Sequence, residues 1–90
     1  MAKVKIHRYL VPESAGSWET IETSGNTLGD CLRQAATRFP RLKTELFDAS
    51  GKLPGHILVL LNSEEVQPDE LGRKVKEGDT IEVLPIIGGG

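Results

Sequence analysis

Residues 56–61 read HILVLL, a near-continuous apolar run with the length of a single β-strand, and the rest of the fold can be worked out from it. An apolar run without polar alternation is typical of a strand buried on both faces, so we expect it to lie centrally in a β-sheet. Asn62 and Ser63 predict a turn after it. Residues 64–66 are expected to form a short returning strand.

A second strand is predicted close to the C-terminus. Residues 77–79 (EGD) are typical of a tight turn, and residues 80–84 (TIEVL) follow with Ile81 and Val83 on one face. Because Pro85 has no backbone N–H, regular pairing between strands is expected to stop near it. The chain then continues with two isoleucines and three glycines.

One main helix is predicted upstream of the apolar run. Thr27 is a favourable N-cap, and Asp30 places an acidic group in the first turn, where it stabilises a helix start. The helix is expected to run to about Arg38 and to end at Pro40. Residues 41–48 are expected to add a short helical turn. Apolar residues at spacings of three and four form one face of the main helix: Leu28, Cys31, Leu32, Ala35 and Phe39.

Two strands joined by a turn at residues 12–16 predict a β-hairpin at the start of the chain. The first strand, residues 4–10, has its apolar residues on one face, and the second, residues 17–23, has two large apolar residues. In chain order these are Val4, Ile6 and Leu10, then Trp18 and Ile21.

The predicted order of elements is therefore a hairpin, a helix, a loop, a strand, a short strand and a final strand. One helix packed across one mixed sheet is an α+β arrangement in two layers. The first and last strands are expected to be parallel neighbours, because this closes the sheet around the helix. The order is that of a β-grasp, or ubiquitin-like, fold with a mixed sheet of roughly four to five strands. Residues 1–85 would form this domain and residues 86–90 a flexible C-terminal tail.

Length, charge and cysteine content exclude several classes of function. With 90 residues, the chain has room for one hydrophobic core. Its net charge of −2, from 11 basic and 13 acidic residues, gives no electrostatic reason to expect nucleic acid or an anionic membrane as a partner. The single cysteine, Cys31, cannot form an intramolecular disulfide, and no metal site is expected. The sequence shows no signal-peptide pattern and no membrane-length apolar block, so we expect a cytoplasmic protein.

The last residues carry the chemistry that the rest of the chain lacks. Ile86 and Ile87 lie beyond the last predicted strand, where a monomer has little core left to bury them. Gly88, Gly89 and Gly90 have no side chains, so we expect them to be mobile and thin enough to enter a narrow active site. The terminal carboxylate has a pKa of about 3.3–3.7 and is a poor electrophile at neutral pH. It needs activation, for which adenylation by ATP is the obvious route.

Activation of that carboxylate is expected to need a second protein, because this sequence has no glycine-rich phosphate loop with its lysine. Terminal glycines are also common as inert residues, so the tail alone would be weak evidence for function. Its position after a β-grasp pattern and an apolar pair favours the functional interpretation.

Four stretches of the chain together follow a familiar pattern. Residues 24–29 (SGNTLG) lead into the helix, and residues 57–62 (ILVLLN) form the apolar strand and its turn. Residues 77–85 (EGDTIEVLP) contain a Gly-Asp turn and the last strand, and the end reads Pro-x-x-x-Gly-Gly with Gly89 and Gly90 as the diglycine. In these features the chain resembles the MoaD/ThiS family of ubiquitin-like sulfur carriers, and within it the CysO-type carriers of cysteine synthesis. Only the diglycine motif is chemically specific.

The resemblance implies a carrier that acts as a co-substrate and not as an enzyme, with no catalytic residues and no bound cofactor. Gly90 would be adenylated and converted to a thiocarboxylate, and Gly88 and Gly89 would give it access to active sites. A ubiquitin-activating-type adenylating enzyme would use the ATP. The sulfur would pass to an acceptor, either a cysteine synthase-like enzyme or the large subunit of molybdopterin synthase. The residues implied in partner binding are Pro85, Ile86 and Ile87.

The recipient of the sulfur stays open between cysteine, molybdopterin, thiamin and related metabolites. Gly88 departs from the family, which often has alanine there, so Gly88 and Gly89 are an alternative diglycine if Gly90 is trimmed. Three other functions stay open: a protein modifier conjugated through the terminal glycine, the small subunit of molybdopterin synthase, and an interaction module with an inert tail. An enzyme is least supported, because no convergent set of titratable groups is visible.

The remaining notable residues have simpler interpretations. Cys31 is expected to be buried and inert, and His7 and His56 are expected to be surface imidazoles. Trp18 is expected to pack in the core or at its rim. The acidic side chains of Glu64, Glu65, Asp69 and Glu70 are expected to form a solvated acidic face, and the basic side chains of Arg73, Lys74 and Lys76 a solvated stretch near a turn.

Overall fold

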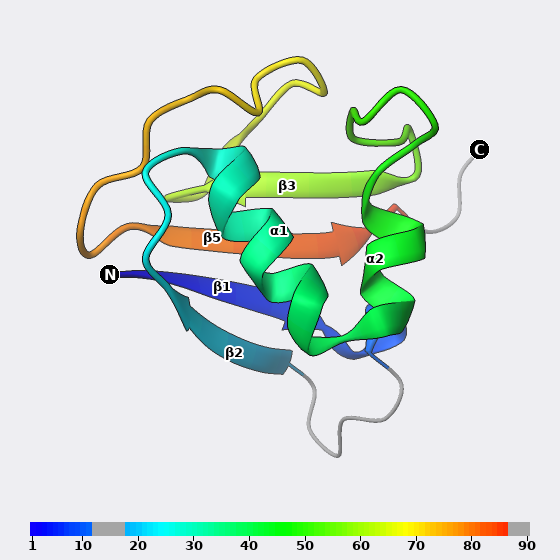
Figure 1. The fold of residues 1–90 in the computed structure, drawn as a ribbon, viewed down its shortest axis with the longest axis horizontal. Helices are drawn as coiled ribbons and strands as arrows, with labels where there is room; N and C mark the ends of the chain where they lie inside the picture. The colour runs from blue at the N-terminus through cyan, green and yellow to red at the C-terminus, as the bar shows by residue number, and fades with distance from the viewer. Residues whose placement is uncertain (12–17, 87–90) are drawn as a thin grey trace.

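The computed structural model describes residues 1–11 and 18–86. The predicted turn at residues 12–16 and residues 87–90 of the predicted tail lie outside them. Figure 1 shows two α-helices packed across one face of a single sheet. In chain order the elements are β1 (Ala2–His7), the 3-10 helix η1 (Arg8–Leu10), β2 (Trp18–Thr23), α1 (Leu28–Arg38), α2 (Pro40–Leu46), β3 (Ile57–Leu61), β4 (Glu64–Glu65) and β5 (Thr80–Pro85).

The sheet formed by the described residues has five strands in the order β2-β1-β5-β3-β4. β1 and β5 are parallel, with Val4 opposite Ile81, and the other neighbouring strands are antiparallel. This confirms the predicted mixed sheet with its first and last strands side by side. β5 lies at the centre, so the C-terminal strand is held on both sides.

The hydrophobic core lies between the sheet and the two helices. Alternate residues of each strand point toward the helices, and the predicted apolar face of α1 is buried against them. The contributing residues include Val4, Ile6, Ile21, Ile57, Val59, Leu61, Ile81 and Val83 from the strands, and Leu28, Cys31, Leu32, Ala35, Leu42 and Leu46 from the helices.

Both helices begin where sequence chemistry favours a start. The Thr27 side-chain oxygen accepts a hydrogen bond from the Asp30 N–H at 3.2 Å, which confirms the predicted N-cap of α1. Pro40 ends α1, as predicted, but it is also the first residue of α2, because a proline at the first helical position loses no hydrogen bond. The predicted short helical turn is thus a helix of seven residues. Among the described residues, neither helix is long and apolar enough to cross a membrane.

The prediction that the apolar strand is buried on both faces is wrong. In β3, Ile57, Val59 and Leu61 are buried, whereas Leu58 and Leu60 are only half-buried. The helices cover one face of the sheet and leave the other open (Figure 1). The second set of leucines therefore lies on an open face of the sheet. β3 does have a strand on each side, but β5 takes the central position.

The predicted first strand is also shorter than expected. β1 ends at His7, and residues 8–10 turn into η1, whose Leu10 is buried from this 3-10 turn and not from the strand. The His7 side chain caps η1 by accepting a hydrogen bond from the Tyr9 N–H at 3.3 Å. The chain therefore leaves the sheet at the same end as the C-terminus of β5.

Candidate functional site

The root of the C-terminal segment is fixed by the sheet. Pro85 lies opposite Ile57 in the β3–β5 pair, and the Ile86 N–H donates to the His56 carbonyl at 2.8 Å. β5 ends at Pro85, which confirms the prediction that regular pairing stops near this residue, and Ile86 adds one further backbone hydrogen bond.

The sheet tolerates Pro85 because of the direction in which its missing N–H would point. Successive backbone N–H groups of a strand point to opposite neighbours, so the nitrogen of Pro85 faces the β1 side. The last β1–β5 pair joins Ile6 and Val83, and β1 has left the sheet by the level of Pro85. The proline therefore removes no hydrogen bond from the β3–β5 ladder, and the β1–β5 ladder ends next to it.

The described part of the predicted site consists of two residues. Pro85 is half-buried, and Ile86 is 54% exposed, which agrees with a side chain available to a partner. Ile87 and the three terminal glycines, Gly88, Gly89 and Gly90, lie outside the described residues. The predicted thiocarboxylate position and its access residues therefore stay predictions.

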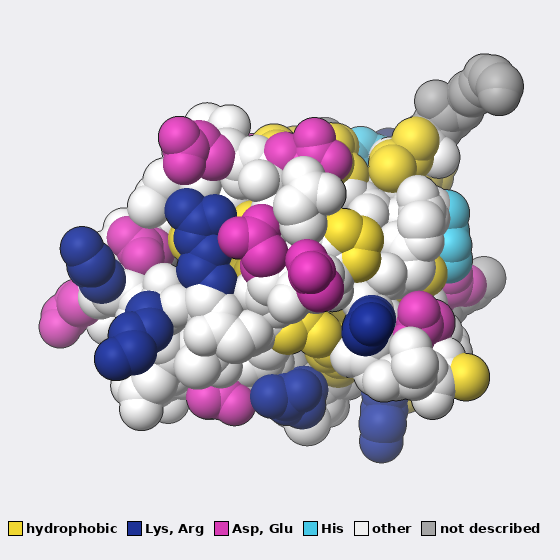
Figure 2. Space-filling model, turned by 90° about the horizontal axis from the view of Figure 1, so that it is seen from above, with side chains coloured by type: hydrophobic (Ala, Val, Ile, Leu, Met, Phe, Trp, Pro, Cys, Tyr) yellow, Lys and Arg dark blue, Asp and Glu magenta, His cyan; other side chains and the backbone are white. Residues whose placement is uncertain are grey.

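An apolar surface adjoins this root on the open face of the sheet. Leu84 lies opposite Leu58, and both are half-buried. Ile86 follows Leu84 by two residues, so in extended backbone its side chain lies on the same face. In Figure 2, hydrophobic side chains gather near the end of the described chain, whereas charged side chains of both signs occupy the opposite end of the view.

Aromatic side chains extend this surface across the sheet. Trp18 of β2 lies opposite His7 of β1, and their rings meet edge to face with centroids 5.1 Å apart. The Tyr9 ring lies 5.0 Å from His7, and the Lys5 ammonium is 5.9 Å from the Trp18 ring centroid. Tyr9 is 63% exposed and Trp18 36%. Exposed aromatic residues of this kind are enriched in protein–protein interfaces.

The register joins the two groups into one surface. Lys5 lies beside Glu82 in the parallel β1–β5 pair, and the next residues on the same face of these strands are His7 and Leu84. A single row therefore crosses the open face at the end of the sheet from which the C-terminal segment leaves. We call it the open-face row, and it consists of Trp18, His7, Leu84 and Leu58.

Sequence reasoning placed Trp18 in or near the core and missed the open-face row. The signal was present in the alternation of β1 and β2, in which buried residues on one face leave His7 and Trp18 on the other. The pairing of these two residues depends on the hairpin register, which the turn at residues 12–16 could not supply from sequence alone.

The notable carboxylates of the chain serve in turns and caps. Hydrogen bonds from the Lys76 backbone N–H and then from the Asn62 side chain hold the pKa of Asp79 below its ordinary value. The pKa of Asp30 is lowered in the same way, first by the Thr27 side chain and then by Arg33. Within the described residues, no group of three or more His, Cys, Asp and Glu side chains could hold a metal ion.

Cys31 is fully buried in α1, as predicted, and its sulfur lies 3.7 Å from the Gly25 carbonyl oxygen. The backbone donors at the start of this helix are also occupied. The Leu28 and Gly29 N–H groups each donate at 2.8 Å to carbonyls of the loop at residues 71–73. These donors are therefore not free to bind a phosphate group, in contrast to a helix N-terminus that forms a phosphate site.

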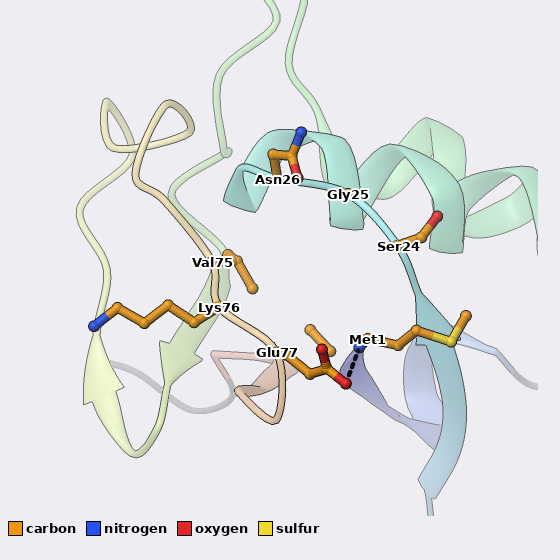
Figure 3. Close-up of a pocket in the computed structure, with 8 residues that line it drawn as sticks. Met1, Ser24, Gly25, Asn26, Val75, Lys76 and Glu77 are labelled. Atoms are coloured by element: carbon orange, nitrogen blue, oxygen red, sulfur yellow. Dashed lines mark ion pairs between the residues drawn. The ribbon is translucent and has the colours of Figure 1, made fainter.

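A polar hollow lies at the end of the molecule that carries the N-terminus (Figure 3). It has a volume of about 290 Å³ and lies between the chain start, residues 24–26 and residues 75–77. The Met1 ammonium forms an ion pair with Glu77 at 3.7 Å across its mouth. Figure 1 shows the N-terminus and the C-terminal end of β5 at opposite ends of the sheet, so this hollow is remote from the C-terminal root.

Fold and site together define a ubiquitin-like β-grasp protein whose central strand leads directly into a glycine-ended C-terminus. The model of the ThiS family matches residues 10–90, and the chain belongs to this family. The sulfur carrier protein CysO of Mycobacterium tuberculosis is 29% identical over 90 residues, which cover 97% of this chain and 96% of the relative.

Two solved structures show the same fold. The Amycolatopsis orientalis BexX/CysO complex contains a chain with a TM-score of 0.79 and 28% identity, and the match covers 100% of both chains. Small archaeal modifier protein 1 (SAMP1) from Haloferax volcanii matches with a TM-score of 0.77 and 28% identity, over 99% of this chain and 98% of that one.

Proposed function

We propose that this chain is a sulfur carrier whose terminal residue, Gly90, is adenylated and then converted to a thiocarboxylate. The observation that carries the proposal is the place where the sheet ends. Among the described residues the last backbone hydrogen bond joins Ile86 to His56 beside the open-face row, and Ile87 and three glycines follow in the sequence. A partner that binds the open-face row therefore lies next to the C-terminal segment, whose last three residues are glycines without side chains.

The proposed chemistry has two steps. The terminal carboxylate attacks the α-phosphate of ATP, so that a glycyl adenylate forms and pyrophosphate leaves. A hydrosulfide ion then attacks the glycyl carbonyl, a C–S bond forms, the C–O bond to the phosphate breaks, and AMP leaves. The product is a thiocarboxylate at Gly90. ATP and the groups that activate it belong to a partner enzyme of the ubiquitin-activating type.

The terminal segment acts as the part that enters the partner. Extended, residues 87–90 reach about 14 Å at ~3.4 Å each. Gly88 and Gly89 leave room for the partner's walls to close on the backbone, while Pro85, Ile86 and Ile87 dock outside the catalytic pocket. Burial of one such isoleucine at an interface contributes up to ~1.5–3 kcal/mol before the costs of association.

The likeness to CysO favours cysteine as the destination of the sulfur, with a cysteine synthase-like enzyme as acceptor. The large subunit of molybdopterin synthase is the alternative acceptor. The existence of a BexX/CysO complex supports a mode of action in which such a carrier is bound by a partner protein. Cytoplasmic action stays a prediction.

The test is intact-mass spectrometry of the full chain after incubation with ATP, sulfide and extract of its native cells. The expected result is exchange of one oxygen for sulfur, located on the C-terminal fragment. Location matters, because oxidation of Met1 adds nearly the same mass. A variant that lacks Gly88, Gly89 and Gly90 should remain unmodified while its circular dichroism spectrum is unchanged. The proposal fails if the intact chain gains no sulfur under any of these conditions.

The likeness to SAMP1 favours a second function, conjugation to other proteins through the same glycine. Both functions use the adenylate and differ in the attacking group, which is sulfide in one and a lysine amine in the other. Conjugates linked by an isopeptide bond in the same extract would identify the modifier. A thiocarboxylate without conjugates would support the carrier function and not the modifier function.

A further inference from the structure

A shallow apolar groove lies between α1 and α2, separate from the site described above. It has a volume of about 290 Å³ and is lined by Arg33, Ala36, Thr37, Lys43 and Phe47. Its exposed residues belong to helices that cover the sheet, so the groove opens on the side opposite to the open-face row (Figure 1). A groove of this size accommodates one or two aliphatic side chains and is too small for most cofactors.

The floor and the rim of this groove differ in chemistry. The floor is apolar and includes Ala36, which is buried, and Phe47, which is half-buried. The rim carries two cations, Arg33 and Lys43. Arg33 is paired with Asp30 at 3.3 Å, whereas Lys43 is exposed and forms no ion pair with another described residue. The rim thus retains a net positive charge on a chain with a net charge of −2.

An occupant that fits must combine aliphatic side chains with a carboxylate. The sequence itself contains such a segment at residues 86–90, with two isoleucines followed by three glycines. From Ile87 to the terminal carboxylate the extended chain spans roughly 10 Å. The axes of two packed helices are about 8–10 Å apart, so Ile87 can lie on the floor while the carboxylate reaches a rim cation.

We propose that the groove binds the C-terminal segment of a second copy of the chain, with Ile87 against Ala36 and Phe47 and the carboxylate beside Lys43. The chain's own tail is too short for this. Ile86 is held on the sheet by its bond to His56, and residues 87–90 add about 14 Å. To reach the groove, the tail would have to pass around α2. That path is half the circumference of a helix ~10–12 Å in diameter, or roughly 17 Å, which is longer than the tail.

The contact is head-to-tail, since each copy offers one tail and one groove. The contact holds the terminal carboxylate in the groove of another copy while no partner enzyme is bound. The carboxylate is released when a partner enzyme binds the tail. The interaction is weak and reversible, because an exposed ion pair and a small apolar area contribute little.

The test is an NMR titration of the ¹⁵N-labelled full chain with a synthetic peptide of residues 84–90 (LPIIGGG). The free acid should give saturable shifts at the amides of Ala36 and Phe47. The C-terminally amidated peptide should bind roughly two- to fivefold more weakly, the range of one exposed ion pair. Lys43→Glu should weaken binding of the free acid by at least the same factor. Lys74→Glu, an equal charge change on an exposed residue outside the groove, should not.

Absence of shifts with millimolar peptide would overturn the proposal. Shifts confined to the open-face row, or equal affinity of the acid and the amide, would do the same. Sedimentation velocity gives an independent check on the whole protein. The full chain should associate more as its concentration rises, and a chain that ends at Pro85 should not. Equal behaviour of the two would also overturn the proposal, and neither result depends on thiocarboxylate chemistry.

Discussion

The backbone N–H of Ile86 donates to the carbonyl of His56 at 2.8 Å, while the Ile86 side chain is 54% exposed. One residue therefore has two separable roles. Its backbone closes the sheet, and its side chain lies free beside the open-face row. These roles can be tested apart, because one substitution removes the hydrogen bond and another removes only the side chain.

Ile86→Pro removes the N–H and should lower the free energy of unfolding by about 1 kcal/mol, the usual net contribution of one hydrogen bond. Ile86→Ala keeps the bond and should leave stability within about 0.5 kcal/mol, because the lost side chain is exposed. Urea denaturation measures both. In calorimetry with the activating enzyme, however, Ile86→Ala should lose affinity. If alanine leaves that affinity unchanged, Ile86 is not a docking residue.

Leu84 should be the most sensitive position of the open-face row, since it lies between His7 and Leu58 in the row. Leu84→Glu is expected to weaken binding to the activating enzyme at least tenfold, or about 1.4 kcal/mol. Thr20→Glu is the matched control, because Thr20 is exposed on the same face but outside this row. Equal losses in the two variants would show that charge on the face, and not the row, governs binding.

Side-chain hydrogen bonds connect the turn after β3 with the turn before β5, and this connection should weaken in acid. The Asn62 amide donates to Asp79 at 3.0 Å, and the Asn62 amide oxygen accepts from the Thr80 N–H at 2.9 Å. Asp79 also accepts from the Lys76 N–H at 2.8 Å, and its pKa is lowered chiefly by that bond. A carboxyl with a folded-state pKa below the unfolded value stabilises the fold above the unfolded pKa, near 3.8.

That stability should be lost as the pH falls from about 4 through the folded-state pKa of Asp79. Thermal unfolding at pH 7 and near pH 3 would show it. Asp79→Asn should be less stable than the parent at pH 7, and the gap should narrow in acid. Asp69→Asn, at an exposed position, controls for loss of a negative charge. A gap that stays constant with pH would contradict the role given to the Asp79 carboxylate.

Gly25 is required by close packing ahead of α1. A Cβ there would lie 2.6 Å from the Asp30 Cβ and 2.9 Å from the Cys31 nitrogen, closer than non-bonded atoms allow. Gly25→Ala should therefore lower the free energy of unfolding by roughly 1–3 kcal/mol. Gly55→Ala is the control, since a Cβ at Gly55 meets nothing within 4 Å. Similar denaturation midpoints for the two variants would disprove the clash.

Cys31 should take no part in sulfur transfer, because its side chain is fully buried in the core. The native protein should react with an aromatic disulfide reagent far more slowly than the protein unfolded in urea. Cys31→Ala should still gain sulfur at the C-terminus. Rapid labelling of the native thiol, or loss of sulfur uptake in this variant, would require a new account of the residue.

The architecture could be predicted because its signals are local. Thr27, Pro40 and the Gly-Asp turn each act within a few residues, and the spacing of apolar residues identified the main helix. The apolar run at residues 56–61 was harder, because a leucine looks the same in sequence whether a helix or a partner covers it. Leu58 and Leu60 were predicted to be buried, but no helix covers them and they are half-buried on the open face.

The site was predictable only in part, for a related reason. The chemistry of the tail is contained in its own residues, whereas the open-face row brings together residues from four strands. The contact between Asn62 and Asp79, 17 positions apart, likewise follows from the pairing of β3 with β5. Such contacts depend on register, and register is set by the whole sheet.

The central place of β5 also has a mechanical consequence. β1 and β5 are parallel neighbours, so the N-terminal end of β1 and the C-terminal end of β5 lie at opposite ends of the sheet (Figure 1). Tension between the N-terminal end of β1 and the tail would load all the hydrogen bonds of this pair in shear, so that many must break at once instead of one after another. β3 grips β5 from the other side. A force applied to the C-terminal end of β5 is therefore expected to meet strong resistance before the domain unfolds.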